Sequence, residues 1–469
     1  MNNMYSFAIQ IILSFCEDDY LFVAINKEWK KIYISLFKNT KTVISYYSLY
    51  SLQQIKYAIG VGYEISCRTA NAAARLGNMC ILKYLKEISA DEWMFEYIHL
   101  YAAKGGHLEV LKWARENNYP WDINTCALAA RGGHLELLKW ARENGCPWDA
   151  DTCAFAALEG HFEILKWAHK NYCPWNKYTC AYAAEGGHLE ILKWARENGC
   201  PWDAETCAKA AKNGYLDILQ WAHENSCPWN ELTCVYAASG GHFEMLKWAR
   251  ANGCPWNEWT CSYAAKSGSI DILKWARKNN CPWNEWTCAH AAQGGHLDIL
   301  KWARANGCPW NEYTCAHAAQ GGHLDILKWA RANGCPWNKH TCTYAARGGN
   351  IDILKWAHEN GCPWNEMTCA SAATRRHLNV LKWARKNGCP WDERTCERAA
   401  GQGHLDILKW ARANGCPWNG NICAFIASSI YPCPYASQWI IDNFSTNVLT
   451  EKQLKRLKQA HENDRLWHE

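Results

Sequence analysis

Cysteine and histidine are the residues of this chain whose number and spacing could support chemistry. The chain has 27 cysteines among 469 residues, and all but four of them fall into two regular ladders. One ladder runs from Cys126 to Cys423, and in the other, from Cys146 to Cys416, each cysteine precedes Pro-Trp. Thiols arranged in this way could form disulfides, bind zinc or fill space as small hydrophobic side chains.

The spacing argues against disulfides and against zinc. Equivalent cysteines of neighbouring units would lie on packed helices roughly 8–10 Å apart, beyond the ~7 Å Cα separation that a disulfide can bridge. The candidate zinc ligands Cys146, Cys153 and His161 have the spacing C-x6-C-x7-H, wider than the close cysteine pairs of structural zinc sites. The pattern favours buried free thiols, which persist in reducing compartments. We therefore expect no metal, no cofactor and an intracellular, cytoplasmic location.

Histidine is the second candidate for chemistry, because nine copies of a repeated block begin with it. Such regular recurrence fits a structural hydrogen bond in each copy better than nine catalytic sites. The sequence also lacks a phosphate-binding glycine loop, a G-x-S-x-G nucleophile motif and an HExxH zinc motif. We expect no enzymatic activity.

The block that positions these residues is 27 residues long and recurs twelve times without a change of length, filling residues 107–430. The first copy begins at His107 and the last at His404. A fixed period of this size means that each block buries its apolar face only by stacking on its neighbours. Such stacks are elongated and offer a long continuous surface, which favours binding as the function.

The first half of each block is predicted to form a helix, as the copy that begins at His296 illustrates. Apolar residues cover most of this helix, and Asp298, Lys301 and Arg304 form one polar stripe. The segment 306–309, Asn-Gly-Cys-Pro, ends the helix, because Gly favours the left-handed position after a helix and Pro cannot continue one.

The second half is predicted to form a shorter helix around residues 314–319, with Asn311 or Thr314 as its N-cap and two glycines at its end. Its small Ala and Cys residues would let it lie close against the neighbouring unit. Each copy also has one Lys-Trp and one Pro-Trp tryptophan, and we expect these to form ladders in the core. The fold class predicted is therefore all-α, a solenoid of stacked antiparallel helix pairs.

Composition limits the partners. The chain is 49% hydrophobic and 20% charged, with a formal net charge of +5, which is too small for its length to indicate a nucleic-acid partner. A typical copy carries as many positive as negative charges, which weakens the case for a nucleic-acid partner further. No stretch of eighteen or more apolar residues could span a membrane, and no secretory signal is present. We expect a monomer with a protein partner, without nucleic acid or membrane.

The helical part of the repeat resembles the ankyrin family. Residues 318–328, AAQGGHLDILK, are similar to the ankyrin signature A-A-x-x-G-H-L-E-V-V-K, and residues 333–338 are similar to the ankyrin turn x-G-A-D-V-N. Residues 341–346 stand where ankyrins have T-P-L-H-x-A-A, but Cys342 replaces the proline and the segment is one residue shorter. The β-hairpin finger of ankyrins is absent as well. Short Cys-Pro-Trp units of this kind resemble the ankyrin-like arrays of large DNA viruses of amoebae.

The regions flanking the array are expected to be helical caps. Residues 46–106 contain degenerate repeats, and residues 431–469 contain a last helix pair with a charged helix. Residues 1–45 resemble an F-box, the motif that docks adaptors onto a ubiquitin-ligase scaffold, although the usual leading Leu-Pro is missing. The residues that carry this resemblance are Ile9, Ile12, Leu13, Phe15, Leu21 and Trp29. The alternative is an apolar helix pair that caps the first repeats.

The residue before each Thr and the residue four places later vary between copies that are otherwise nearly identical. The spacing places both on one face of the second helix, and in proteins resembling ankyrins that helix lines the concave surface. The candidate binding residues are Tyr178, Tyr182, Leu232, Tyr236, Trp259, Tyr263, Trp286, His290, Tyr313, His317, His340 and Tyr344. Glu205 and Lys209 interrupt the row. The alternative is that these rings fill gaps between helices, although that role would favour uniform residues.

Two functions therefore stay open at this point: a protein-interaction scaffold that binds its partner on the concave face, and an F-box-type adaptor that recruits a host protein to a ubiquitin ligase.

One boundary between repeat copies is irregular. Every copy but one is preceded by Gly, and the exception is Arg376. Because a left-handed residue with a Cβ costs on the order of 1 kcal/mol, we expect a local weak point there, or a tolerated irregularity.

Overall fold

The computed structural model describes residues 51–60, 67–89 and 92–417, and within these ranges every regular element is helical. This confirms the predicted all-α solenoid of helix pairs without a β-finger. The described residues divide into two compact units, which meet between Trp175 and Asn176. The F-box-like residues Ile9 to Trp29 and the expected cap at 431–469 lie outside the described residues and stay predictions.

The first unit contains helices that begin before the regular array. Its elements are α4 (Leu52–Gly60), α5 (Cys67–Arg75), α6 (Met79–Ile88), η2 (Glu92–Phe95), α7 (Ile98–Gly105), α8 (Leu108–Glu116), α9 (Ile123–Arg131), α10 (Leu135–Glu143), α11 (Ala150–Leu158) and α12 (Phe162–Lys170).

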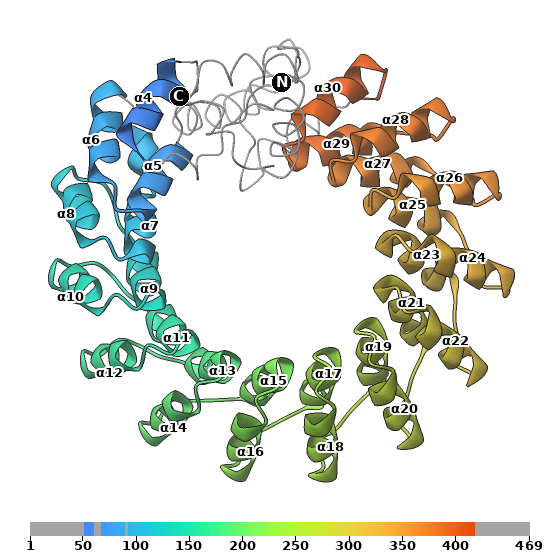
Figure 1. Cartoon of the computed structure of the whole chain (residues 1–469), viewed down its shortest axis with the longest axis horizontal. Coiled ribbons are helices and arrows are strands. Elements are labelled where there is room, and N and C mark those ends of the chain that lie inside the picture. The colour runs from blue at the N-terminus through green and yellow to red at the C-terminus, as the bar shows by residue number, and fades with distance from the viewer. Residues whose placement is uncertain (1–50, 61–66, 90–91, 418–469) are drawn as a thin grey trace, which may run out of the picture. The chain divides into compact units, whose positions relative to one another are not determined.

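The second unit alternates two kinds of helix, which form two layers (Figure 1). The inner helices, which carry the Thr-Cys motif, follow one another along the inside of its curve. They are α13 (Lys177–Gly186), α15 (Ala204–Asn213), α17 (Glu231–Ser239), α19 (Glu258–Lys266), α21 (Glu285–Gly294), α23 (Glu312–Gly321), α25 (Lys339–Arg347), α27 (Glu366–Thr374) and α29 (Glu393–Gly401).

The outer helices, which carry the Lys-Trp motif, form the second layer on the outside of that curve. They are α14 (Leu189–Glu197), α16 (Leu216–Glu224), α18 (Phe243–Ala251), α20 (Ile270–Lys278), α22 (Leu297–Ala305), α24 (Leu324–Ala332), α26 (Ile351–Glu359), α28 (Leu378–Lys386) and α30 (Leu405–Ala413). None of the helices in the described ranges is long and apolar enough to cross a membrane.

Each inner helix begins at an Asn or Asp whose side chain caps it. In α23 the Asn311 Oδ1 accepts a hydrogen bond of 3.0 Å from the Tyr313 backbone N–H. Asn311 is therefore the N-cap and Thr314 is not, which settles the two alternatives that the sequence left open. The inner helix is also not the shorter of the two, since α23 has ten residues and α22 has nine.

The end of each outer helix follows the predicted glycine and proline signals. In α22 the Cys308 N–H donates to the Ala303 carbonyl over 3.0 Å, and the Gly307 N–H donates to Arg304. Gly307 has φ +81°, so the left-handed residue completes a Schellman motif. The Asn306 side chain donates to the Trp302 carbonyl over 2.8 Å.

Small side chains form the core between inner helices. In α23 the residues Thr314, Cys315, Ala316, Ala318 and Ala319 are all fully buried, and the same pattern recurs in other copies. The outer helices contribute only one Ile, one Leu and one Ala per copy to this core. Because Ala and Cys have short side chains, neighbouring inner helices can approach closely, and burial of this apolar surface holds the stack together.

The two cysteine ladders meet each other rather than running separately. Each cysteine that precedes Pro-Trp donates to the carbonyl of the inner-helix N-cap one unit earlier, as Cys308 does to Asn284 over 3.5 Å. It also contacts the thiol of that helix, and this contact together with burial raises the pKa of the Cys288 thiol. Every described cysteine is a free thiol, and no group of described residues has the ligands to hold a metal ion.

The tryptophans do not form core ladders, and this expectation was wrong. They are half-buried and lie beside the outer helices. Trp310 meets Trp329 of the next copy edge to face at 6.0 Å, and the Arg304 guanidinium lies 4.1 Å from the Trp310 ring centroid. The large rings find room on this side because the space between inner helices accepts only small residues.

The histidines that open copies make the structural hydrogen bond expected of them. His296, which follows α21, has its Nε2 3.2 Å from the Lys266 carbonyl at the end of α19, the inner helix one unit earlier, and a Cβ added to Gly268 would lie 2.6 Å from this ring. Asn350, which replaces histidine in one copy, donates to the equivalent carbonyl of Gln320 over 3.2 Å. The bond ties one unit to the next.

We predict that His296→Ala lowers the free energy of unfolding by about 1–3 kcal/mol, because the carbonyl loses its partner and the ring leaves a void. His296→Asn should cost less, since Asn350 makes the same bond elsewhere in the array. Unfolding of both variants in guanidinium chloride measures the difference. Equal losses for Ala and Asn would show that the ring volume, and not the hydrogen bond, stabilises the junction.

Within the described ranges, five residues other than glycine have left-handed backbone conformations: Asn118, Tyr172, Ser226, Asn280 and Arg376. The sequence pointed to Arg376, whose φ is +62° and whose side chain reaches Asp406 at 3.4 Å. The other four replace the glycine that ends an outer helix in most copies. At Tyr172 side-chain packing offsets the least of the backbone strain, because this side chain is 93% exposed.

We predict that Tyr172→Gly stabilises the first unit by about 0.5–1 kcal/mol, because relief of the left-handed strain exceeds the entropy that glycine loses on folding. The matched change Asn118→Gly should have a smaller effect, since Asn tolerates this conformation. Arg376→Gly should also stabilise the fold, but the gain is reduced because the variant loses the small contribution of the exposed ion pair with Asp406. Guanidinium chloride midpoints test all three, and a lower midpoint for Tyr172→Gly would exclude strain there.

Candidate functional site

The candidate binding residues lie on inner helices, at the second and sixth positions after the N-cap. They belong to α13, α17, α19, α21, α23 and α25. Eight of them, on the four consecutive helices α19 to α25, touch one another, and we call this set the aromatic strip. It consists of Trp259, Tyr263, Trp286, His290, Tyr313, His317, His340 and Tyr344.

The first row of the aromatic strip contains the residues that precede Thr. The ring centroids of Trp259 and Trp286 are 6.2 Å apart, and those of Trp286 and Tyr313 are 5.4 Å apart in a stacked geometry. Tyr313 stacks in turn on His340 at 5.9 Å. Pairs at these separations stabilise by about 0.5–1.5 kcal/mol each beyond their burial.

The second row runs parallel to the first, one helical turn further along each helix. Tyr263 meets His290 edge to face at 5.5 Å, His290 meets His317 at 6.0 Å, and His317 meets Tyr344 at 5.5 Å. The rings of the two rows also touch within a helix, as Trp286 and His290 do at 5.8 Å. The strip is therefore one continuous aromatic layer.

The two rows differ in their exposure to solvent. Trp259 in the first row is 37% exposed, whereas His290 in the second is 8% exposed. The rings therefore pack between helices and also present faces to solvent, so the gap-filling and binding roles are both compatible with their positions. Leu232 and Tyr178, at equivalent positions outside the strip, are 44% and 40% exposed.

Charged residues interrupt the row of candidate binding positions at Glu205 and Lys209 of α15. Lys209 pairs with Glu185 of α13 at 2.8 Å, which separates Tyr178 and Tyr182 from the strip. Leu232 and Tyr236 lie on α17, between this ion pair and Trp259.

Burial keeps the two central histidines uncharged. Burial lowers the pKa of His290 to about 4, and the nearby positive charge of Lys266 adds to the effect. Burial likewise lowers the pKa of His317 to about 4, with smaller contributions from His290 and Lys266. The Nδ1 atoms of both rings are buried without a hydrogen-bond partner. Both side chains therefore act as neutral aromatic rings at neutral pH.

Sequence reasoning missed the residues at the first position of each inner helix. Glu258, Glu285 and Glu312 each directly precede a first-row side chain, and Glu231 precedes Leu232 at the equivalent position of α17. An acidic residue in the first turn is common, because it interacts favourably with the helix dipole, and these glutamates therefore did not stand out. Their consecutive occurrence over four copies was the signal that could have found them.

Comparisons with known proteins support an ankyrin-repeat protein. Residues 207–250, a short stretch of the array, match the family model described as ankyrin repeats in many copies. No curated protein matches the chain. Among solved structures, the human ASB11 ankyrin repeat domain is 15% identical and aligns over 33% of this chain and 83% of its own, with a TM-score of 0.27.

The chain is also similar to the maize pentatricopeptide repeat protein PPR10, at 14% identity over 96% of this chain and 81% of that one, with a TM-score of 0.30. A structure of PPR10 in complex with an 18-nt psaJ RNA element gives 12% identity, 99% and 97% coverage and a TM-score of 0.26. Superpositions this loose carry no argument about function.

We predict that acid destabilises the aromatic strip. An unfolded histidine titrates near 6.5, so between pH 6.5 and 4 the unfolded chain binds protons that His290 and His317 refuse in the folded state, and stability falls as the pH falls. Each ring should contribute roughly 2 kcal/mol to this loss.

The matched variant is His290→Tyr with His317→Tyr, because tyrosine already occupies this position in α17, α19 and α25. Guanidinium chloride unfolding at pH 7.5 and pH 4.5 measures both proteins, and the difference between them isolates these two rings from other titrating groups. The same pH dependence in the variant as in the natural chain would exclude the two histidines as its source.

Proposed function

We propose that this chain is a protein-interaction scaffold whose partner binds on the aromatic strip. Ankyrin repeats are generally protein-interaction scaffolds, and the family match supports that class here. The observation that carries the proposal is the strip itself, eight contiguous aromatic side chains over four adjacent inner helices. Exposed aromatic patches mark interaction sites, and Trp and Tyr dominate binding hot spots.

The scaffold has no catalytic role in this proposal. The histidines that open copies are engaged in bonds between units, as His296 is, and the two of the strip are neutral and packed among rings. The free thiols fit a reducing compartment, and we infer that the protein acts in the cytoplasm.

The alternative, an F-box-type adaptor for a ubiquitin ligase, depends on residues 1–45. The pattern from Ile9 to Trp29 favours it, whereas the family match lies elsewhere in the chain. In that case the array would still capture the partner, and the N-terminal residues would dock on the ligase scaffold. Deleting residues 1–45 should then remove ligase components from the captured set and leave the array's partner in place.

We predict that replacing Trp259, Trp286 and Tyr313 by Ala abolishes capture of the partner from cell lysate. The control is Tyr172→Ala, which removes an equally large ring that is 93% exposed but lies away from the strip. Proteins captured by the natural chain and the control but lost in the triple variant are the partners that the proposal requires. Retention of all captured proteins by the triple variant would exclude the strip as the binding surface.

The stacked geometry adds a stability cost to this experiment, on the order of 0.5–1.5 kcal/mol for each aromatic pair lost. A second variant avoids it. Trp259→Lys keeps a long side chain at the most exposed position of the strip and introduces a charge there, so binding should weaken while far-UV circular dichroism and the unfolding midpoint change little.

A further inference from the structure

The four glutamates beside the aromatic strip have no partner within the described part of the chain. Glu231, Glu258, Glu285 and Glu312 take part in no ion pair or side-chain hydrogen bond there. Each is the first residue of an inner helix, directly before Leu232, Trp259, Trp286 or Tyr313. A row of acidic groups therefore runs along one edge of the apolar rings.

Some charged groups elsewhere on the repeat are matched by this chain's own residues. On the inner helices Glu185 lies 2.8 Å from Lys209 and 3.3 Å from Lys212, and Lys177 lies 2.8 Å from Asp203. On the outer helices glutamates such as Glu244 pair with a lysine three residues later. Asp298 of α22 and Glu393 of α29 take part in no ion pair within the described residues either, so what distinguishes Glu258, Glu285 and Glu312 is the aromatic side chain that follows each of them.

The helix dipole does not explain the row by itself. An acidic first residue stabilises a helix by about 0.3–1 kcal/mol, but α15 begins with Ala204 and α13 and α25 begin with Lys177 and Lys339. These inner helices form with the same capping geometry. The fold therefore does not require a glutamate at this position.

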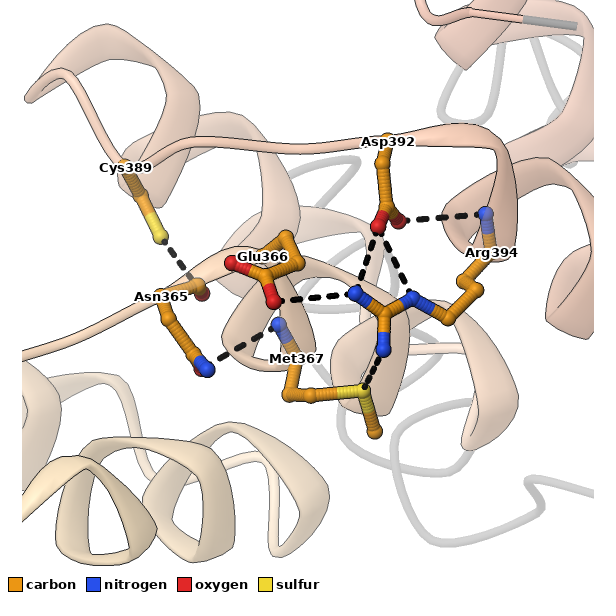
Figure 2. A network of polar contacts seen from close by, with 6 residues as sticks. All are labelled: Asn365, Glu366, Met367, Cys389, Asp392 and Arg394. Carbon is orange, nitrogen blue, oxygen red and sulfur yellow. Dashed lines mark hydrogen bonds and ion pairs between the residues drawn. The ribbon is translucent and has the colours of Figure 1, made fainter.

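Further along the array, the side chain of Arg394 lies against the first two residues of a neighbouring inner helix (Figure 2). The Arg394 guanidinium donates to Glu366 Oε1 over 2.9 Å and approaches the Met367 sulfur at 3.4 Å. Glu366 and Met367 are the first and second residues of α27, so they correspond to Glu285 and Trp286 of α21. The structure thus contains a guanidinium bound to the same pair of positions.

In the strip this internal guanidinium is replaced by a ring. The residue that corresponds to Arg394 in the copy after α21 is Tyr313, which stacks on Trp286 and leaves Glu285 unpaired among the described residues. The N-cap also changes, since Asp392, which binds Arg394 at 2.7 Å, corresponds to Asn311. A guanidinium arriving from outside would therefore find one carboxylate and an aromatic face instead of two carboxylates.

We propose that the glutamate and aromatic pairs of the inner helices α19, α21 and α23 bind arginine side chains of an extended segment of the partner protein. This inference rests on the proposed function and names the chemistry of the partner. A guanidinium donates two parallel hydrogen bonds to a carboxylate and stacks flat on an aromatic ring, whereas a lysine ammonium does neither as well.

The spacing of the sites sets the spacing of the arginines. Packed helices lie roughly 8–10 Å apart, and an extended chain rises at most ~3.3–3.6 Å per residue. Arginine at every third residue therefore keeps register with successive inner helices. The three pairs lie on the consecutive inner helices α19, α21 and α23 and end before Lys339, the first residue of α25, so they offer three sites. Lys266, at the far end of α19, lies 5.9 Å from the ring centroid of Tyr263 in the second row.

The test uses the full chain and fluorescein-labelled synthetic peptides, with binding followed by fluorescence anisotropy. The probe is (Arg-Gly-Ser)4 with blocked termini, and its controls are (Lys-Gly-Ser)4 and (Arg-Gly-Ser-Gly)4. We expect saturable binding of the probe, with weaker binding of the lysine peptide and of the peptide with arginine at every fourth residue. Equal affinity for all three peptides would overturn the proposal, because it would show attraction of charge without a guanidinium site.

Variants locate the site. Glu258→Gln, Glu285→Gln and Glu312→Gln together should weaken the probe by tenfold or more, since a hydrogen bond to a charged group contributes about 1.5–3 kcal/mol and tenfold corresponds to about 1.4 kcal/mol. The matched control is Glu190→Gln, Glu244→Gln and Asp352→Asn, which removes three charges from the outer helices. An equal loss with the control set would overturn the proposal.

The outcomes separate this inference from the proposed function. If the arginine peptide does not bind, while the triple alanine variant of the strip still loses a captured partner, the scaffold function stands and the arginine chemistry falls. If the triple glutamine variant loses binding of the arginine peptide and capture of that partner, while its far-UV circular dichroism is unchanged, the scaffold function and the arginine chemistry both stand.

Discussion

Close approach of neighbouring inner helices is the constraint on which the rest of this structure depends. The Thr, Cys and Ala residues that face the adjacent helix are buried almost completely in copy after copy. A larger side chain at any of these positions would push two units apart, and the displacement would have to be absorbed by every junction bond nearby, because interiors are packed at high density. The strict 27-residue period follows, since an inserted residue would rotate the small face away from its neighbour.

The same constraint explains where the large side chains lie. Tryptophan has no place between inner helices, so the Pro-Trp and Lys-Trp rings collect beside the outer helices, where each meets a ring of the next copy and an arginine or histidine stacks on it. It also explains the cysteines. Paired thiols from the two ladders fit the small space there, and the thiols that precede Pro-Trp add a second hydrogen bond to N-cap carbonyls that already accept the Thr backbone N–H, as at Asn284.

Much of the fold could be predicted from the sequence, because the period, the glycines and the capping residues are local signals. The helix pairs, Gly307 at the end of α22 and the absence of a finger in the described copies agree with those predictions. The errors concern distances between units. The core ladders of tryptophan were wrong, and the contact between the two cysteine ladders was not predicted, because periodicity shows that residues recur but not which faces they share. The stacking of Trp286 on Tyr313 could be anticipated only as proximity, since the ring angles depend on side-chain packing.

The candidate site occupies the positions that this packing leaves open. The first, second and sixth residues after each N-cap lie outside the Thr, Cys and Ala junction, and they are where the copies differ most. Variation there costs the stack little, because the buried Thr, Cys and Ala residues of the same helix carry the junction. Tyr178, Lys209, Trp286 and Arg394 can therefore follow one another on an unchanged scaffold, and ion pairs such as Lys209–Glu185 neutralise charges that the array does not present to a ligand. A glutamate without a partner among the described residues, beside a ring with an open face, is on such a surface the group that our proposal assigns to an arginine of the partner.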